Sequence, residues 1–353
     1  MKNTLKYIVI LVLLCSVADT YSQSVQDTVT GDKVSKLFSN QEILKIKMNF
    51  SINEMRRKTN DSTLINSQIS YLDEDGSWKS LDVKIRARGN FRRNNCYYPP
   101  IKMEIEKSIN KGTLFQGNQK IKIVFPCNMQ SSANDYIIKE YMAYKLYEVV
   151  SPYHFKTRLL DISFTEGSGN NPKTHELKGI FIEDDDKVAK RHGGQVLKRR
   201  VNPLGQGGLT SVQNEFFQYM IGNTDYSTAV QHNQQLIFVN KESLPVPYDF
   251  DMSGLVYTNY SVVSEIGGES LPIRSVRERM YRGFRRDPAI IEQVRQEYIA
   301  NEARMMEIAD SLAPQFDNPK ELEGARKYLA EFFEILKDDE KYKRAISAKL
   351  RNK

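Results

Sequence analysis

Seven short segments between residues 43 and 182 alternate apolar and polar side chains, and this pattern constrains the fold more than any other feature. Successive side chains of a strand point to opposite faces, so the alternation predicts half-buried β-strands. The expected strands are Ile43–Phe50, Ser67–Leu72, Leu81–Arg88, Ile101–Glu106, Lys120–Phe125, Arg158–Phe164 and Lys178–Ile182. The first half of the chain is therefore expected to form a sheet.

Helical periodicity interrupts the strands once and then dominates the second half of the chain. A helix is predicted over residues 134–150, with Asn134 as its cap and Pro152 just beyond its end. Further helices are expected at 210–221, 288–312 and 319–350, and short extended segments at Gln235–Val239 and Pro245–Tyr248. Asp287-Pro288 and Asn318-Pro319 each place a cap before a proline at the first helical position.

The pattern predicts an α+β chain with two lobes. The expected N-lobe, residues 41–185, holds the sheet and the helix at 134–150, and the expected C-lobe, residues 186–353, is mostly helical. Residues 23–40 are polar and lack periodicity, which indicates a linker.

The first 22 residues have the three parts of a cleavable signal peptide. Lys2 and Lys6 precede an apolar stretch, Ile8–Val17, which is too short to span about 30 Å of hydrocarbon. Small residues then favour cleavage before Gln23. No second apolar run approaches membrane length, so we expect an exported protein without a transmembrane anchor, in the periplasm, on the cell surface or outside the cell.

Two cysteines remain after the expected cleavage, Cys96 and Cys127. From the residues alone, a disulfide and two buried free thiols are both open interpretations. An oxidising compartment favours the disulfide.

The formal net charge of +7 comes largely from clustered cations. The clusters are Arg86, Arg88, Arg92 and Arg93; Lys198, Arg199 and Arg200; and Arg274, Arg277, Arg279, Arg282, Arg285 and Arg286. Such clusters suit phosphates, acidic proteins or anionic surfaces, or they are ordinary solvated faces. Nucleic acid is disfavoured as a partner, because no nucleic-acid-binding motif accompanies the charge and the protein is expected to leave the cytosol.

Several common chemistries lack their motifs. The four histidines have no metal-ligand spacing and no H-E-x-x-H is present, which argues against a zinc enzyme. The chain also lacks G-x-S-x-G, the Walker A motif and the Rossmann G-x-G-x-x-G.

One constellation of polar residues in the second half remains. It consists of Asn223-Thr224-Asp225, His232-Asn233 and Asp249-Phe250-Asp251, with a short strand before the last group. Either acidic group alone is more often a turn than a site. Together they match magnesium-assisted phosphoryl transfer, in which one Asp orients the attacking group while an Asn and a second Asp hold the metal.

The chain resembles the CotH family of atypical secreted kinases over about residues 83–256. The motifs that carry the resemblance are R-A-R-G-N at 86–90, P-P-I-K at 99–102, Y-M-A-Y-K-L at 141–146 and D-F-D at 249–251. Within that family it is similar to uncharacterised exported bacterial members that carry F-Q-Y-M-I-G-N-T-D and P-V-P-Y-D-F-D.

The resemblance implies a two-lobed protein-kinase-like fold that transfers phosphate from ATP to protein hydroxyls with Mg²⁺. It assigns the catalytic position to Asp225 and metal binding to Asn233 and Asp249, with Asp251 as a second acidic ligand. Three features depart from ordinary kinases: no H-R-D precedes Asp225, Asn233 lies further from it than four residues, and no glycine-rich lid is visible.

In such a fold the N-lobe supplies a lysine for the phosphates and a helix glutamate to hold it. Glu140 is the expected glutamate, because it lies on a helix face with tyrosines, where an unpaired carboxylate would be costly. Lys102 is the first choice for its partner, and Lys120 and Lys122 are close rivals. An exposed Glu140 is the alternative.

Arg86 and Arg88 are expected to share one face of their strand. This pair could clamp phosphate oxygens or an acidic substrate, or it could pair with Glu104 and Glu106 across the sheet.

The expected function is therefore that of an exported CotH-like kinase, acting on a protein or surface-polymer acceptor with ATP and Mg²⁺. Transfer of AMP in place of phosphate is a related possibility. The alternative is a catalytically inactive pseudokinase or surface binding module that engages an acidic partner.

Overall fold

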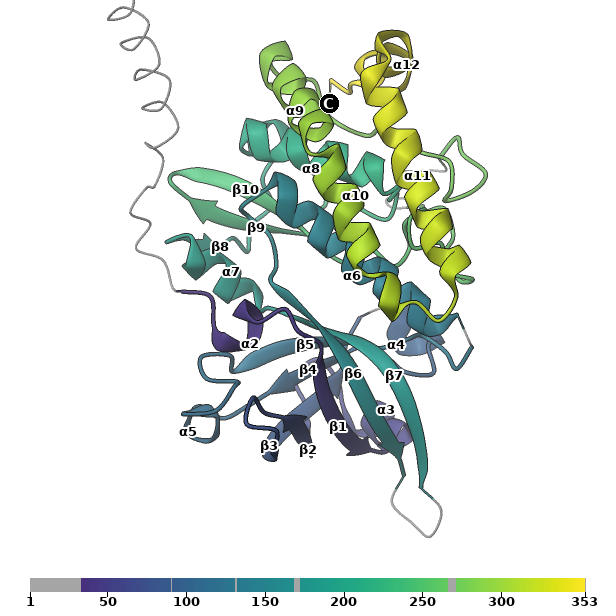
Figure 1. Cartoon of the computed structure of the whole chain (residues 1–353). Coiled ribbons are helices and arrows are strands. Elements are labelled where there is room, and N and C mark those ends of the chain that lie inside the picture. The colour runs from purple at the N-terminus through teal and green to yellow at the C-terminus, as the bar shows by residue number, and fades with distance from the viewer. Residues whose placement is uncertain (1–32, 90, 131, 168–171, 266–270, 353) are drawn as a thin grey trace, which may run out of the picture.

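The computed structural model describes residues 33–352, apart from residues 90, 131, 168–171 and 266–270. The predicted signal peptide, residues 1–22, and the first part of the predicted linker lie outside the described residues. The described chain forms a body of strands and a body of helices, which lie one above the other in Figure 1.

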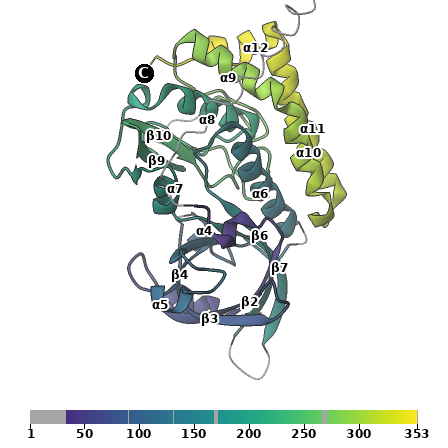
Figure 2. The same ribbon diagram turned by 60° about the vertical axis from the view of Figure 1, so that its left-hand side comes forward.

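Seven strands close a barrel in the strand body. In chain order they are β1 (Leu44–Phe50), β2 (Ile65–Leu72), β3 (Trp78–Ala87), β4 (Ile101–Glu104), β5 (Lys120–Val124), β6 (Thr157–Glu166) and β7 (Lys173–Ile182). Their order around the barrel is β1-β2-β3-β4-β5-β7-β6, and β6 returns to β1 (Figure 2). The neighbouring strands are antiparallel except β1 and β6, which are parallel with Leu44 opposite Leu160.

The closed barrel overturns the expected fold class. An α+β, two-lobed protein-kinase-like fold, with a β-rich N-lobe that includes helix 134–150, is wrong for this chain. The strand segments themselves are close to those predicted, but β1 and β6 pair across the gap that a sheet would leave open. The helix at 134–150, moreover, belongs to the core of the helical body, where it also contacts β6 and β7 of the barrel, and it is not part of the core inside the barrel.

The barrel interior is filled by alternate residues of its strands. In β1, the buried Leu44, Ile46 and Met48 alternate with exposed residues. Burial of each such side chain contributes roughly 1.5–3 kcal/mol, so the period-two pattern decides which face of each strand turns inward. Tyr71 and Phe115 meet edge to face in the same core, with ring centroids 5.2 Å apart.

The helical body is built around α6 (Ala133–Val150) and α8 (Gly208–Met220), which α9 (Pro288–Ala300), α10 (Glu302–Ser311), α11 (Pro319–Lys337) and α12 (Asp339–Ala345) cover. The predicted helix at 134–150 thus begins one residue earlier. Its predicted cap is wrong, because Asn134 lies inside the helix and its side chain accepts a hydrogen bond from the Lys178 N–H, 2.9 Å away.

Each of the two long helices predicted near the C-terminus is divided in two. Asn301 separates α9 from α10, and Asp338 separates α11 from α12. The predicted caps are confirmed: Asp287 accepts from the Ala289 N–H, and Asn318 accepts from the Lys320 N–H.

A three-stranded sheet packs against the helical body and leads into the polar constellation. Its strands are β8 (Gln195–Val196), β9 (Gln234–Val239) and β10 (Glu242–Pro247), in the order β10-β9-β8. The edge position of β10 tolerates Pro245 and Pro247, which lack the N–H that a central strand needs. The short helices are α2 (Lys36–Ser39), α3 (Ile52–Lys58), α4 (Phe91–Asn95), α5 (Lys107–Asn110) and α7 (Asp185–Arg191).

A disulfide joins Cys96 and Cys127, as predicted. It ties the residue after α4 to the segment between β5 and α6, and the Tyr97 N–H adds a 2.7 Å hydrogen bond to the Cys127 carbonyl. Within the part of the chain that the structure describes, no helix combines the length and hydrophobicity needed to cross a membrane.

Candidate functional site

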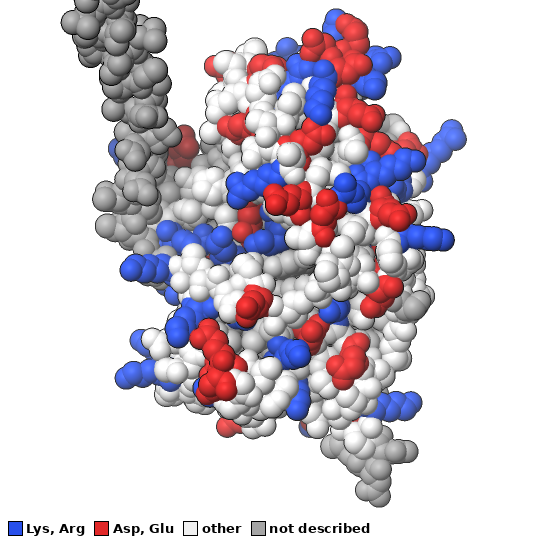
Figure 3. Space-filling view, viewed as in Figure 1, with Lys and Arg blue, Asp and Glu red and all other residues white. Residues whose placement is uncertain are grey.

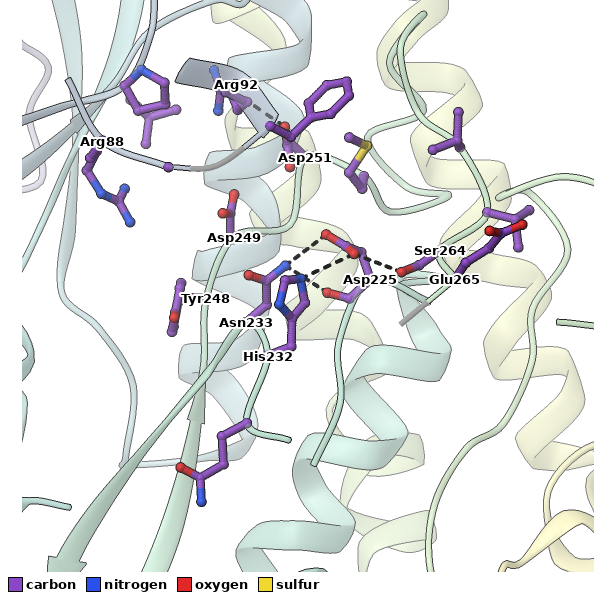
Figure 4. A pocket seen from close by; sticks show the side chains of 18 residues that line it. Arg88, Arg92, Asp225, His232, Asn233, Tyr248, Asp249, Asp251, Ser264 and Glu265 are labelled. Atoms are coloured by element: carbon purple, nitrogen blue, oxygen red, sulfur yellow. Dashed lines mark hydrogen bonds and ion pairs between the residues drawn. The ribbon is translucent and has the colours of Figure 1, made fainter. Parts of the chain in front are cut away.

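A cavity of about 650 Å³ lies where α4 and the ends of the barrel strands face the helical body. Its walls combine apolar side chains with three acids of the predicted constellation, Asp225, Asp249 and Asp251. Other lining residues come from the segment at 262–265, the loop at 231–233 and the segment around Arg88 and Arg92 (Figure 4). Pro100, Val124, Tyr248 and Met252 complete the wall, so residues from distant parts of the chain meet here.

The loop that carries Asp225 is fixed by its own sequence. Gly222 follows α8 with φ of +62°, a conformation that glycine adopts without strain. Asn223 is buried, and its side-chain oxygen accepts the Asp225 N–H at 2.9 Å. From the opposite side, Arg282 donates to the carbonyls of Thr224 and Tyr226 at 2.8 and 3.0 Å.

The Asp225 carboxylate is held by three side chains (Figure 4). Asn233 donates its amide N–H to Oδ2 at 3.0 Å and to the Asp225 carbonyl at 2.7 Å. Ser264 donates to Oδ1 at 3.0 Å, and His232 Nε2 lies 3.4 Å from the same oxygen. The hydrogen bond to Asp225 raises the pKa of His232, because the carboxylate stabilises the imidazolium.

Phe250, the residue between the two acids of the D-F-D motif, fixes their positions. Phe250 is fully buried and packs on Tyr144 of α6 and Phe217 of α8, with ring centroids 4.7 and 5.2 Å apart. Asp249 has φ of +65°, which is costly for a residue with a Cβ, and its N–H donates to the Tyr144 hydroxyl at 3.0 Å. Such local strain is often found at functional positions.

Asp251 lies deeper and shares a buried guanidinium with Glu140. Arg92 on α4 places Nε 3.7 Å from Asp251 and Nη1 3.8 Å from Glu140. Arg92 also donates to the Phe125 carbonyl, and Tyr260 donates to Asp251 at 3.0 Å. Burial raises the pKa of both carboxyl groups, although Arg92 opposes the shift.

The buried Glu140 confirms that the α6 glutamate is not on an exposed face, but its cation is Arg92 and not a lysine. Lys102 on β4 lies 3.9 Å from Glu104 and is absent from the cavity lining. Lys122 is buried against Asp185 and the rings of Phe155 and Tyr248. Lys120 is exposed.

The two arginines predicted to act together have different surroundings. Arg88 follows β3 and lines the cavity, with no hydrogen bond or ion pair from its side chain to another described residue. Arg86 lies outside the cavity and pairs with Asp61 at 3.3 Å. The pairing with Glu104 and Glu106 does not form, because Arg86 stands opposite Lys102 in the register of β3 and β4.

Sequence reasoning missed Arg92 as the partner of Glu140 and missed Ser264 and Tyr260 altogether. The sequence did hold an indication of Arg92, since a buried helix glutamate requires a nearby cation. Ser264 and Tyr260 lie in a long loop without periodicity, where no pattern singles out one polar residue.

The donor chemistry of the cavity fits Mg²⁺. Asp249 and the Asn233 amide offer oxygen atoms, which are the ligands that this ion prefers, whereas Asp251 is already held by Arg92 and Tyr260. No group of three His, Cys, Asp or Glu side chains in the described segments is close enough to hold a metal ion unaided. Mg²⁺ usually takes only one or two carboxylates and completes its shell with water and substrate phosphates. The residues present are compatible with that mode.

No family model matches the chain, and no curated protein matches it either. The cavity must therefore be interpreted from its own residues.

Proposed function

We propose that the protein catalyses Mg²⁺-dependent phosphoryl transfer from ATP to a hydroxyl group of a protein or surface-polymer acceptor. One observation carries the proposal. Asp225, Asn233 and Asp249, which are separated in sequence, line one cavity together with the arginine Arg88. The motifs that resemble the CotH family contribute Asp249 and Arg88. The fold lends no support, so the argument rests on the cavity.

Asp225 is suited to orient the acceptor hydroxyl. It is partly exposed in the cavity, and hydrogen bonds from Asn233 and Ser264 fix the direction of its carboxylate. A fixed carboxylate can accept the hydroxyl hydrogen and hold the attacking oxygen in line with the phosphate. His232 beside it adds a positive charge at lower pH, which would weaken this role.

Asn233 and Asp249 are suited to hold the metal. The amide N–H of Asn233 is already donated to Asp225, so its amide oxygen is the atom left for a cation. Mg²⁺ bound there would neutralise charge on the ATP phosphates. Arg88 offers planar N–H donors for phosphate oxygens.

We further propose that the protein works outside the cytosol. The Cys96–Cys127 disulfide supports this, because such bonds persist in oxidising compartments. N-terminal sequencing of the exported protein should find Gln23 first. An intact Met1 in a membrane fraction would contradict the proposal.

Two amide substitutions test the proposed roles of the acids. Asp249→Asn should abolish Mg²⁺-dependent ATP binding and transfer together, because it removes the charge that faces the cation. Asp225→Asn should leave ATP binding nearly unchanged but reduce transfer by orders of magnitude, since Asp225 acts on the hydroxyl in the transition state. Asp82→Asn on the exposed face of β3 is the matched control.

Calorimetry with ATP and Mg²⁺ measures binding, and ATP labelled at the α- or the γ-phosphate measures transfer. Label transferred only from the γ-position supports phosphoryl transfer, whereas α-label identifies AMP transfer. If Asp249→Asn binds ATP and Mg²⁺ as well as the unmodified protein, the metal assignment is wrong. The chain would then be better described as a binding module for an acidic partner.

A further inference from the structure

The arginine-rich segment at 274–286 is largely used inside the molecule. Four of its side chains donate to backbone carbonyls: Arg277 to Gly254, Arg279 to Met220 and Tyr328, Arg282 to Thr224 and Tyr226, and Arg286 to Pro203, Leu204 and Gln206. These guanidiniums hold backbone segments of the helical body together, including the loop that carries Asp225. They are therefore poor candidates for a partner surface.

The run Lys198, Arg199 and Arg200 differs from that segment. All three side chains are exposed, and none forms an ion pair or hydrogen bond with another residue that the structure describes. Consecutive like charges repel one another, and no internal contact compensates for that repulsion. Figure 3 shows Lys and Arg side chains gathered around α7, the helix that precedes β8 and this run.

The run lies beside the mouth of the cavity. Leu197 donates its N–H to the Leu236 carbonyl at 2.9 Å, which aligns this segment with the start of β9. Gln231 donates its side-chain N–H to the Arg199 carbonyl at 3.5 Å. Because Gln231 lines the cavity and bonds to the Arg199 carbonyl, the backbone of the run lies next to a residue of the cavity wall.

We propose that Lys198, Arg199 and Arg200 bind an acidic polypeptide segment of the acceptor whose hydroxyl enters the cavity. This rests on the proposed function, since it names the acceptor of that reaction. Inside the cavity, carboxylates are repelled by Asp225 and Asp249, and Arg88 is assigned to the ATP phosphates. Carboxylates are attracted to the three cations outside it. The charges therefore orient the acceptor, with its carboxylates at the rim and its neutral hydroxyl inside the cavity.

The size of the run favours a peptide over a membrane. Three consecutive residues span at most about 10 Å, the length of a few residues of a partner chain. The run itself holds three cations, whereas binding to anionic lipid typically requires clusters of about four to eight. Of the neighbouring cations on α7, Arg191 is already paired with Glu183 at 2.8 Å. Two of the three residues are arginines, which bind carboxylates through two parallel hydrogen bonds.

The test uses the mature full chain and a short fluorescent peptide of glutamates around one serine. Replacing Lys198, Arg199 and Arg200 together by Gln should weaken peptide binding, measured by anisotropy at low salt, by about tenfold. The charge-conserving variant Lys198→Arg, Arg199→Lys, Arg200→Lys should keep more of the affinity than the triple Gln variant, because all three positive charges remain. The control replaces Lys341, Lys343 and Arg344 of α12 by Gln, which removes the same charge far from the cavity.

Equal losses of peptide affinity in the two triple Gln variants, or no loss of affinity in either, would overturn the proposal. The proposal would also be overturned if the triple Gln variant lost binding to vesicles of anionic phosphatidylglycerol but not to the peptide, because the surface would then bind lipid. Thermal melting verifies that each variant folds. The binding assay omits ATP and Mg²⁺, so failure of phosphoryl transfer leaves its result intact. Peptide binding through this run without transfer would instead refute only the proposed function.

Discussion

Glu215 on α8 should make the stability of the protein depend strongly on pH. Its side chain is 2% exposed, and one carboxyl oxygen accepts the Phe284 N–H at 3.1 Å. The other oxygen has no hydrogen bond of normal geometry among the described residues, although the Tyr281 hydroxyl lies close enough to favour the charged carboxylate. Burial raises the pKa of Glu215 from 4.5 to about 8, and the hydrogen bond from Phe284 only partly offsets it.

The sign of this pH dependence follows from whether the folded or the unfolded chain binds the proton more tightly. Between about pH 4.5 and 8 the folded protein keeps a proton on Glu215 that the unfolded chain has released, so the free energy of unfolding falls as pH rises. The slope is about 1.4 kcal/mol per pH unit, and the whole window corresponds to on the order of 5 kcal/mol. Below the window both states hold the proton, and above it neither does.

The substitution Glu215→Gln isolates this contribution. Glutamine is neutral at every pH and its side-chain oxygen can still accept from Phe284. Urea denaturation at several pH values from about 5 to 8 should show the variant gaining stability relative to the unmodified protein, by about 1.4 kcal/mol per unit. Glu323→Gln, at an exposed position of α11, is the control for a general change in net charge. If the free energies of unfolding of Glu215→Gln and the unmodified protein change with pH in parallel, the reasoning is wrong.

Two further predictions concern the loop before Asp225 and the disulfide. Gly222→Ala should destabilise the protein by at least about 2 kcal/mol in urea denaturation, because its Cβ would lie 1.9 Å from the Tyr328 hydroxyl at positive φ. Gly324→Ala in α11 meets no atom within 4 Å and should instead stabilise by roughly 0.5–1 kcal/mol, and a similar loss at both sites would contradict the steric argument. Replacing Cys96 and Cys127 by Ser should cost about 3–4 kcal/mol, since the bond joins residues 31 positions apart. An unchanged urea midpoint would show that the disulfide does not constrain the unfolded chain.

The strands were predictable because their signal is local. Alternation in β1 reports the two faces of a strand directly, and β2 and β3 are joined by a turn at Asp75-Gly76. Closure of the barrel was not predictable, since the pairing of Leu44 with Leu160 is specified by the shape of the whole core. No local pattern distinguishes a sheet from a barrel of the same strands.

The candidate site, like the barrel, was predictable only where the local sequence carries the signal. Asp225, Asn233 and Asp249 lie in short loops next to regular elements, so their order along the chain indicated a common location. The wrong choice of Lys102 has a physical reason. A buried glutamate requires a cation, but the sequence does not say which one, and Arg92 lies on a one-turn helix without a periodic pattern.

The parallel pairing of β1 with β6 also sets an order of assembly. During synthesis β1 emerges before the other strands, yet one of its two neighbours follows only after β5 and α6 have been made. Until then β1 keeps an edge of unpaired N–H and carbonyl groups, which is a template for pairing with other chains. A nascent or truncated chain that stops before β6 should therefore aggregate, and a factor that holds the chain unfolded until that point would favour correct closure.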